Sequence, residues 1–333
     1  VHHQVGLLDM SAFAKFEVSG PRASGWLDAL FANRIPHQVG RVGLCHLLTD
    51  KGGVRSEFTV HRTGPEQFYL VSAGALERHD FDYLQKLRPR DGTVDLQKIT
   101  TQQGVFVLAG PRSRELLQRI TRVDLSNAAF PWLVGKEADL GVAHGRVLRV
   151  NFVGELGYEL HHPIEMQNYL FDLLFEAGED LGLRPFGIRA MDALRLEKSY
   201  RLVPRELSIE YAALESGLQR FIKFDKTDFI GKAGLSRWQE EGFRWQFVTA
   251  EMRGADGVDA RGSEPIYRAG ELVGRSTSGG YGWRVGKSLV LGMVALECAT
   301  VGTEMEIEVL GQRYALVVID ESPFDPDNAR LRS

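Results

Sequence analysis

The residues best placed to do chemistry are two carboxylates beside a pair of glycines. The stretch 153–160 (VGELGYEL) carries Glu155 and Glu159 next to Gly154 and Gly157. The glycines permit a tight bend between two strands, so both acids would project close to that bend. A carboxylate there can accept hydrogen bonds from a ligand or take a proton from it. Taken alone, the pattern fits a turn with solvated acids better than a site.

Two other patterns are weaker. The run 279–288 (GGYGWRVGKS) resembles a phosphate-binding loop, but Tyr281 stands where that motif requires glycine. A glycine-rich β-hairpin is the better interpretation. His161 and His162 are adjacent, and neighbouring side chains on a strand point to opposite faces, so they do not easily bind one metal ion together. We therefore predict structural or solvated histidines and no metal site.

The glycine turn needs flanking strands, and the sequence around it mixes strands with helices. A strand–turn–strand unit is expected over about 139–160, followed by helices over 166–177 and 187–200. Earlier in the chain, hydrophobic spacing predicts a helix over 22–35 and a β-meander over 42–72. Since no regular βαβ alternation appears, we do not expect a Rossmann sheet.

The character of the sequence changes near residue 243. From there short strands and glycine turns follow, and the run 304–309 alternates strictly between apolar and acidic residues. Strands mixed with helices, followed by strands alone, predict an α+β region over 1–242 and an all-β barrel or sandwich over 243–333. We expect two subdomains within the first region.

Composition sets outer limits on function. The 333 residues are 44% hydrophobic and 25% charged, as in ordinary globular proteins. A net charge of −4 argues against a dominant nucleic-acid surface, and no apolar run approaches the roughly 20 residues of a membrane span. Cys45 and Cys298 are the only cysteines, which favours two buried free thiols over a disulfide framework.

Several segments together resemble the glycine-cleavage T protein (aminomethyltransferase) superfamily, over nearly the entire chain. The segments are 6–11 (GLLDMS), 153–160, 187–197 (GIRAMDALRLE), 214–218 (LESGL), 228–232 (DFIGK), 277–279 (TSG) and 286–288 (GKS). The runs 30–33 (LFAN), 190–198 (AMDALRLEK) and 322–326 (SPFDP) resemble the C-terminal folate-binding half of dimethylglycine and sarcosine dehydrogenases and oxidases. The resemblance implies an aminomethyltransferase-like folate-binding domain with antiparallel sheets and helices, followed by a C-terminal β-barrel.

The resemblance also implies roles for two carboxylates. Glu57, in Gly52-Gly53-Val54-Arg55-Ser56-Glu57, matches the family's acid beside the reacting folate nitrogens, where Asp is usual. Such an acid can take a proton from nitrogen or stabilise a forming cation. Glu159 matches the glutamate that binds the pterin, whose amino group and ring N–H can be accepted by one carboxylate. Glu155 is expected to support the turn, and an acid facing solvent is the alternative interpretation of Glu57.

Further residues enter on the same resemblance. Tyr158, next to Glu159, is expected to contact the cofactor. The aminomethyltransferases carry an Arg where this chain has Met191, and Arg195 is the expected substitute for binding the folate tail, with a structural role as its alternative. Arg330, in a tail expected to fold over the site, is a further candidate for binding the folate carboxylates, and Arg332 is an alternative candidate. The simpler interpretation is that these terminal residues are solvated. The related oxidases place a Tyr where this chain has Phe152.

The function implied is tetrahydrofolate-dependent one-carbon transfer. The chain would capture the carbon released when an N-methyl amine such as dimethylglycine or sarcosine is demethylated, giving 5,10-methylenetetrahydrofolate. One alternative is a stand-alone transferase that moves a methyl group from an N-, O- or S-methyl donor to tetrahydrofolate. Another is a folate-binding protein without catalysis.

Partners and location follow from the same resemblance. A methylated amine or other methyl donor is the expected small-molecule partner, with no nucleic acid and no membrane. FAD is expected only in an upstream oxidoreductase domain or a partner subunit. The start at Val1, without Met, also fits a piece of a longer chain. We expect a cytoplasmic location, or the mitochondrial matrix in a eukaryote.

Overall fold

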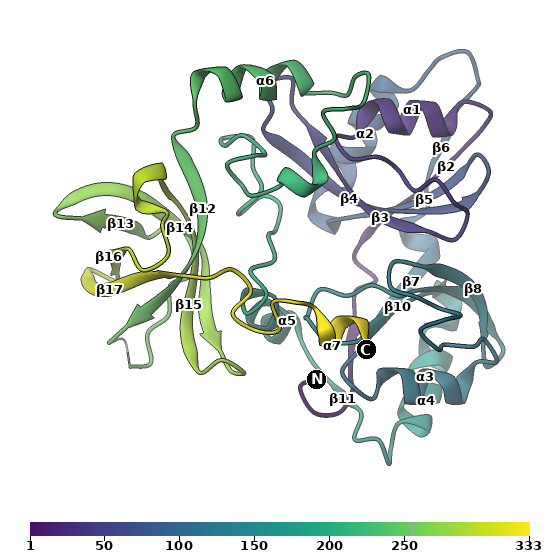
Figure 1. The fold of residues 1–333 in the computed structure, drawn as a ribbon. Helices are drawn as coiled ribbons and strands as arrows, with labels where there is room; N and C mark the ends of the chain where they lie inside the picture. The colour runs from purple at the N-terminus through teal and green to yellow at the C-terminus, as the bar shows by residue number, and fades with distance from the viewer. Residues whose placement is uncertain (255) are drawn as a thin grey trace.

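Two β-sheets with helices build the N-terminal part of the chain, and a closed barrel builds the C-terminal part (Figure 1). The computed structural model describes residues 1–254 and 256–333. The two sheets and the barrel form three lobes, with the barrel to one side of the sheets (Figure 1). The predicted α+β region followed by an all-β barrel is confirmed.

The first sheet has five antiparallel strands. Their order is β3 (Val42–Leu48), β4 (Val54–Gly64), β5 (Gln67–Ser72), β2 (Ala14–Ser19) and β6 (Asp95–Lys98). Helices α1 (Ala23–Leu30) and α2 (Glu77–Leu87) cover one face, where Phe58 and Leu70 of the sheet pack against Leu27 and Leu84 of the helices. Because side chains alternate along a strand, the other face carries the intervening residues.

The second sheet has six strands. Their order is β11 (Arg184–Pro185), β1 (Gly6–Asp9), β7 (Gln103–Ala109), β10 (Gly157–Pro163), β9 (Ala143–Leu148) and β8 (Gly135–Leu140). All pairs are antiparallel except β1 with β11. Helices α3 (Ser113–Ile120) and α4 (Gln167–Ala177) cover one face, packing Leu117 and Leu174 onto Leu108 and Leu160.

The barrel closes with six antiparallel strands. Around the barrel the order is β12 (Trp245–Arg253), β15 (Lys287–Ala295), β14 (Glu271–Gly282), β13 (Pro265–Arg268), β16 (Glu304–Val309) and β17 (Gln312–Ile319). The run 279–288 is the β14–β15 hairpin, as predicted, with Tyr281 paired to Ser288. The domain boundary predicted at 242/243 stays a prediction; β12 begins at Trp245.

The remaining elements connect these bodies. They are α5 (Ile188–Leu196), α6 (Lys232–Glu241), α7 (Ala329–Arg332), and the single 3-10 turns η1 (Gly74–Leu76), η2 (Thr100–Gln102), η3 (Ile164–Met166), η4 (Gln219–Phe221) and η5 (Leu296–Cys298). Helix α5 packs on β14 and β15 of the barrel and places Met191 and Leu194 against the six-stranded sheet. It therefore joins the barrel to that sheet.

Two predicted helices end earlier than expected. The helix predicted over 187–200 stops at Leu196, because Ser199 adopts φ +54° and the Tyr200 N–H returns to the Arg195 carbonyl. The helix predicted over 22–35 is α1 and stops at Leu30, because Phe31 is extended and bridges to Leu47 of β3. The meander predicted over 42–72 is confirmed as β3, β4 and β5.

Over residues 1–254 and 256–333, no helix has the length and apolar character needed to cross a bilayer. Within the same residues, no group of three or more His, Cys, Asp or Glu side chains is arranged to hold a metal ion.

Candidate functional site

The helix-free faces of the two sheets meet at a buried hydrogen bond. Tyr69 of β5 and His161 of β10 are each 1% exposed, and the Tyr69 Oη lies 2.9 Å from His161 Nδ1. Figure 1 shows the five-stranded sheet above the six-stranded one at this junction. The helix-free faces of the two sheets therefore pack against each other at this contact.

Glu159 lies on this inner face of the six-stranded sheet. It pairs with Val107 of β7 and Leu148 of β9, so these three side chains share one face of the sheet. Its side chain is 12% exposed, and Oε2 lies 3.1 Å from His161 Nε2. Since β10 is a regular strand, residues 159 and 161 point the same way.

The hydrogen bonds define the tautomer of His161. Burial lowers the pKa of His161, so its ring is neutral, and burial raises the pKa of Tyr69, so its hydroxyl is protonated. The Tyr69 hydroxyl donates to Nδ1, and Nε2–H then donates to the Glu159 carboxylate. One oxygen of Glu159 is thus held by the protein. Its Oε1 has no hydrogen-bond partner among the residues described and is available to a ligand.

An apolar surface lies beside Glu159. Leu8, Val107, Val153, Met191 and Leu194 are buried together, and Phe152 packs against them. The Phe152 ring lies 5.4 Å from that of Tyr200. A free carboxylate oxygen next to apolar and aromatic side chains suits a flat heterocycle that carries adjacent N–H groups. These residues fit the pterin of a folate.

Glu57 lies on the inner face of the other sheet. It stands directly opposite His46 in the β3–β4 ladder, and its Oε2 is 2.8 Å from His46 Nε2. Its side chain is 24% exposed, whereas that of His46 is fully buried. His61, four residues along β4, pairs with Tyr69 at the junction. Glu57 is therefore roughly 13 Å along the strand from that pair, at about 3.3 Å per residue.

The other predicted ligand residues point elsewhere. Tyr158 is fully buried on the opposite face of β10, in the core under α3 and α4, with its hydroxyl 3.3 Å from Arg114 Nε. Arg195 is fully buried and donates to Asp192, Glu206, Ser278 and the Tyr200 carbonyl. Both assignments stay predictions, but these surroundings argue against contact with a ligand held by Glu159.

Arg330 and Glu155 belong to a network that ties the lobes together. Glu155 is 1% exposed and accepts from Arg284 of the β14–β15 turn at 3.0 Å and from Arg330 of α7 at 2.8 Å. Arg284 also pairs with Glu197 and stacks on Phe324, with its Cζ 3.6 Å from the ring centre. The tail thus folds back onto Glu155 and Arg284, and its predicted position over the folate stays a prediction. The contact predicted between Arg330 and folate stays a prediction.

Sequence reasoning missed the histidine partners of both carboxylates. His161 is two residues from Glu159 on one strand, so the period-two rule places both on the same face. His46 and Glu57 lie on either side of the Lys51-Gly52-Gly53 turn of the predicted meander, but a β-bulge between Leu47 and Leu48 shifts the register. Counting back from the turn would therefore place Ser56 opposite His46, and the sequence carried no signal for the bulge. The histidine pair 161–162 is structural, as predicted: His162 contacts the Leu160 carbonyl and Gln167.

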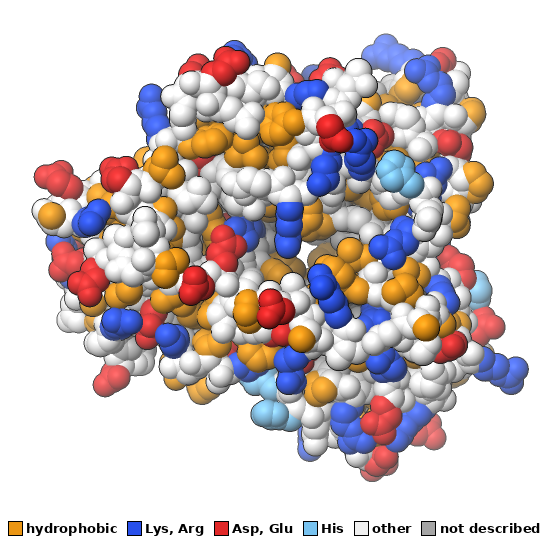
Figure 2. Space-filling model, in the orientation of Figure 1, with side chains coloured by type: hydrophobic (Ala, Val, Ile, Leu, Met, Phe, Trp, Pro, Cys, Tyr) orange, Lys and Arg blue, Asp and Glu red, His pale blue; other side chains and the backbone are white. Residues whose placement is uncertain are grey.

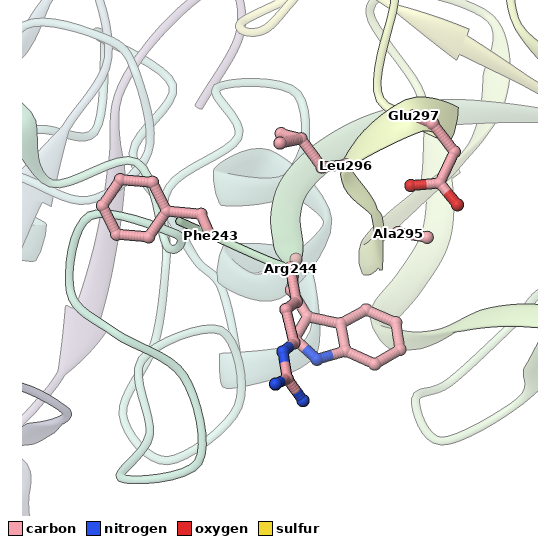
Figure 3. A pocket seen from close by; sticks show the side chains of 6 residues that line it. Phe243, Arg244, Ala295, Leu296 and Glu297 are labelled. Atoms are coloured by element: carbon pink, nitrogen blue, oxygen red, sulfur yellow. The ribbon is translucent and has the colours of Figure 1, made fainter. Parts of the chain in front are cut away.

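The molecular surface has a hollow and a separate pocket. Figure 2 shows a hollow at the centre of one face, between the three lobes, with Lys and Arg side chains at its rim. A separate surface pocket of about 540 Å³ lies against the barrel, lined by residues 243–245 and 295–297 (Figure 3). It contains neither Glu57 nor Glu159. We place the candidate site at the carboxylates, because hydrogen-bonded acids on facing sheets provide chemistry that this pocket does not.

Comparisons with known proteins identify the family and the fold. The chain matches the family model for the GCVT N-terminal domain over residues 1–226. It matches the model for the glycine cleavage T-protein C-terminal barrel domain over residues 246–325. The crystal structure of glycine cleavage system aminomethyltransferase T from Bartonella henselae superposes with a TM-score of 0.88 at 21% identity, covering 98% of this chain and 88% of that one. This likeness shows the fold.

Two relatives show different overall lengths. Mitochondrial dimethylglycine dehydrogenase of Mus musculus is 37% identical over 100% of this chain, which spans 38% of that protein. The aminomethyltransferase of Symbiobacterium thermophilum is 31% identical over 97% of this chain and 87% of its own length. The chain therefore corresponds to most of one relative and to less than half of the other.

Proposed function

Because the chain belongs to the glycine-cleavage T-protein family of tetrahydrofolate-dependent transferases, we propose that it transfers a one-carbon unit to tetrahydrofolate. The carbon would come from the demethylation of an N-methyl amine such as dimethylglycine or sarcosine, and the product would be 5,10-methylenetetrahydrofolate. The observation that carries the proposal is a pair of acids, Glu57 and Glu159, on the facing inner surfaces of two sheets.

Glu159 would bind and orient the folate. The donation from His161 holds Oε2 and leaves Oε1 free, so the carboxylate has accepting capacity for the side-by-side N–H groups of a reduced pterin. The buried cluster around Val107 and Met191 would cover the ring and exclude water. Exclusion of water strengthens the hydrogen bonds to the carboxylate.

Glu57 would move the proton. When bound, tetrahydrofolate supplies two nucleophilic nitrogens for one carbon at the formaldehyde level. The overall reaction releases water from formaldehyde, or a protonated amine from an iminium ion, and the two N–H protons end on that leaving group. Glu57, whose side chain is 24% exposed, can accept one of these protons and pass it to the leaving oxygen or nitrogen, directly or through solvent. Holding the reactants in one space removes a bimolecular entropy cost.

An N-methyl amine as the carbon donor is supported by a relative that matches the whole of this chain. That relative is named dimethylglycine dehydrogenase, and this chain spans 38% of it. We propose that an FAD-containing oxidoreductase domain or subunit oxidises the N-methyl amine and hands the carbon to this chain. A stand-alone methyl transfer would instead need no oxidant and would give 5-methyltetrahydrofolate. The identity of the folate product distinguishes the two.

The test compares Glu57→Gln with wild type under anaerobic conditions. Tetrahydrofolate and formaldehyde are supplied, methylenetetrahydrofolate is measured, and the protein-free rate is subtracted. We expect turnover to fall by about 10²- to 10⁴-fold, the usual loss for a general base, with tetrahydrofolate affinity nearly unchanged. The control is Glu304→Gln, an exposed acid on barrel strand β16, which should behave as wild type. If a folded Glu57→Gln protein turned over normally, Glu57 would not be the base in the reaction.

A further inference from the structure

Glu57 is held by a second side chain that the reaction itself does not require. His46 lies opposite it in the β3–β4 ladder, so both side chains leave the same face of the sheet. The Nε2–Oε2 distance is 2.8 Å. The His46 side chain is fully buried and the Phe221 ring centre lies 5.1 Å from its own. The imidazole is thus fixed by packing, whereas the carboxylate is partly exposed.

The proton positions on His46 follow from its contacts. Nε2 faces a carboxylate oxygen. Without a proton on Nε2, its lone pair would face a lone pair of that oxygen at hydrogen-bond distance and the two would repel, so Nε2 carries the proton. Nδ1 is buried and has no hydrogen-bond partner among residues 1–254 and 256–333. A proton on Nδ1 would be a buried donor without an acceptor, which is costly. The structure therefore favours a neutral ring that donates through Nε2.

This arrangement gives the two carboxylate oxygens of Glu57 different roles. Oε2 is occupied by His46, while Oε1 has no hydrogen bond within the described part of the chain. A glutamate on a partly exposed strand samples several rotamers about three torsions unless something holds it. The donation from a packed ring selects one rotamer and one oxygen. The reactive oxygen is then presented in a fixed direction.

We propose that His46 is a positioning residue that aims Oε1 of Glu57 at the folate nitrogens, without itself relaying the proton. The proposal rests on the proposed function, since it assigns a direction to the base named there. During turnover Oε1 accepts one N–H proton and His46 keeps its Nε2–H throughout. Glu57 then passes the proton to the leaving oxygen or amine through the solvent at its exposed edge. The fully buried imidazole has no route of its own to solvent.

The test uses the whole protein with two His46 variants and a second-site variant. His46→Leu keeps an apolar volume but removes the donor, whereas His46→Gln offers an N–H at a similar reach. Glu57→Asp shortens the base by one methylene and takes it out of reach of His46. Turnover of tetrahydrofolate with formaldehyde, the tetrahydrofolate dissociation constant and the ¹⁵N resonances of the His46 ring are measured.

We expect His46→Leu to lose about 10- to 100-fold in kcat, the scale of a misplaced catalytic group, with the dissociation constant within about threefold of wild type. His46→Gln should recover most of the loss. In the Glu57→Asp background, His46→Leu should cause little further loss. The wild-type Nε2 should give a protonated, pyrrole-type resonance that shifts in Glu57→Gln.

Three results would overturn the positioning role: additive losses in the double variant, a drop in affinity equal to the drop in kcat, or a pyridine-type Nε2. The ¹⁵N measurement needs no folate. If the wild type failed to bind tetrahydrofolate, the proposed function would be wrong. The ¹⁵N measurement of the His46 ring would still show whether His46 donates to Glu57. The two failures are therefore distinguishable.

Discussion

The hydroxyl of Tyr69 should matter for both stability and ligand binding. Tyr69→Phe keeps the ring, including its contact with Arg146, whose guanidinium carbon lies 4.4 Å from the ring centre. It removes only the donor to His161 Nδ1. Both residues are 1% exposed, so water cannot replace the lost hydroxyl. The substitution therefore isolates one buried hydrogen bond between the two sheets.

The expected cost follows from that burial. Leaving a buried acceptor unsatisfied costs about 1–3 kcal/mol. In domains of 150–250 residues each kcal/mol shifts Tm by roughly 2–4 °C, so we expect a decrease of about 2–12 °C. The neutral His161 would also lose the contact that selects its Nε2–H tautomer toward Glu159. We expect tetrahydrofolate to bind about 3- to 10-fold more weakly, at roughly 1.4 kcal/mol per factor of ten.

The assay combines thermal unfolding with calorimetric titration of tetrahydrofolate under anaerobic conditions. Tyr314→Phe is the matched control, because the Tyr314 hydroxyl bonds only to Gln312 on the exposed side of the barrel. The control should stay within about 0.5 kcal/mol of wild type. If Tyr69→Phe melted and bound folate like the control, the Tyr69–His161–Glu159 chain would have no role in holding the site.

Two further predictions concern the Arg284 ion pairs that connect the lobes and the buried His61. Arg284→Met removes the cation between buried Glu155 and Glu197 and should cost about 3–5 kcal/mol in urea unfolding, whereas Arg313→Met, on an exposed ion pair, should cost under about 1. Equal midpoints for the two variants would contradict this. Burial lowers the pKa of His61 from 6.5 to about 3, so the unfolded chain takes up a proton that the folded chain refuses. The free energy of unfolding should fall by up to about 1.4 kcal/mol per pH unit as the pH drops from 6.5 toward 3. The fall should be smaller in His61→Leu. If wild type and His61→Leu lost stability in parallel, His61 would not be the source of the pH dependence.

The local part of the site could be predicted from the sequence. The period of two along β10 places Glu159 and His161 on one face and Tyr158 on the other, so the predicted contact between Tyr158 and the cofactor ran against the sequence's own alternation. The β3–β4 hairpin brings His46 near Glu57, but the β-bulge between Leu47 and Leu48 decides that the two residues stand opposite each other. Both relations involve neighbours within one strand or one hairpin.

The long-range part could not be predicted in this way. Tyr69 and His161 are 92 residues apart and lie on different sheets, so no local period relates them. The sequence left two interpretations of Arg195 open, a contact with the folate tail and a structural role. In the structure Glu206 and Ser278, from a loop and the barrel, accept hydrogen bonds from its guanidinium. Helix α5 ends at Leu196, three residues before Ser199 with its positive φ, and no Gly or Pro in the sequence indicates this end. Such contacts depend on how the lobes pack.

Glu159 offers the most direct test of folate binding at the proposed place. The measurement is the tetrahydrofolate dissociation constant of wild type and Glu159→Gln, titrated anaerobically, with the exposed Glu179→Gln as control. Gln keeps an oxygen for His161 but loses the charge that accepts from the pterin, which is worth about 2 kcal/mol or more. We predict tight binding by wild type and control, and binding at least about 30-fold weaker by Glu159→Gln. A folded Glu159→Gln protein that bound tetrahydrofolate within twofold of wild type would contradict the proposed site.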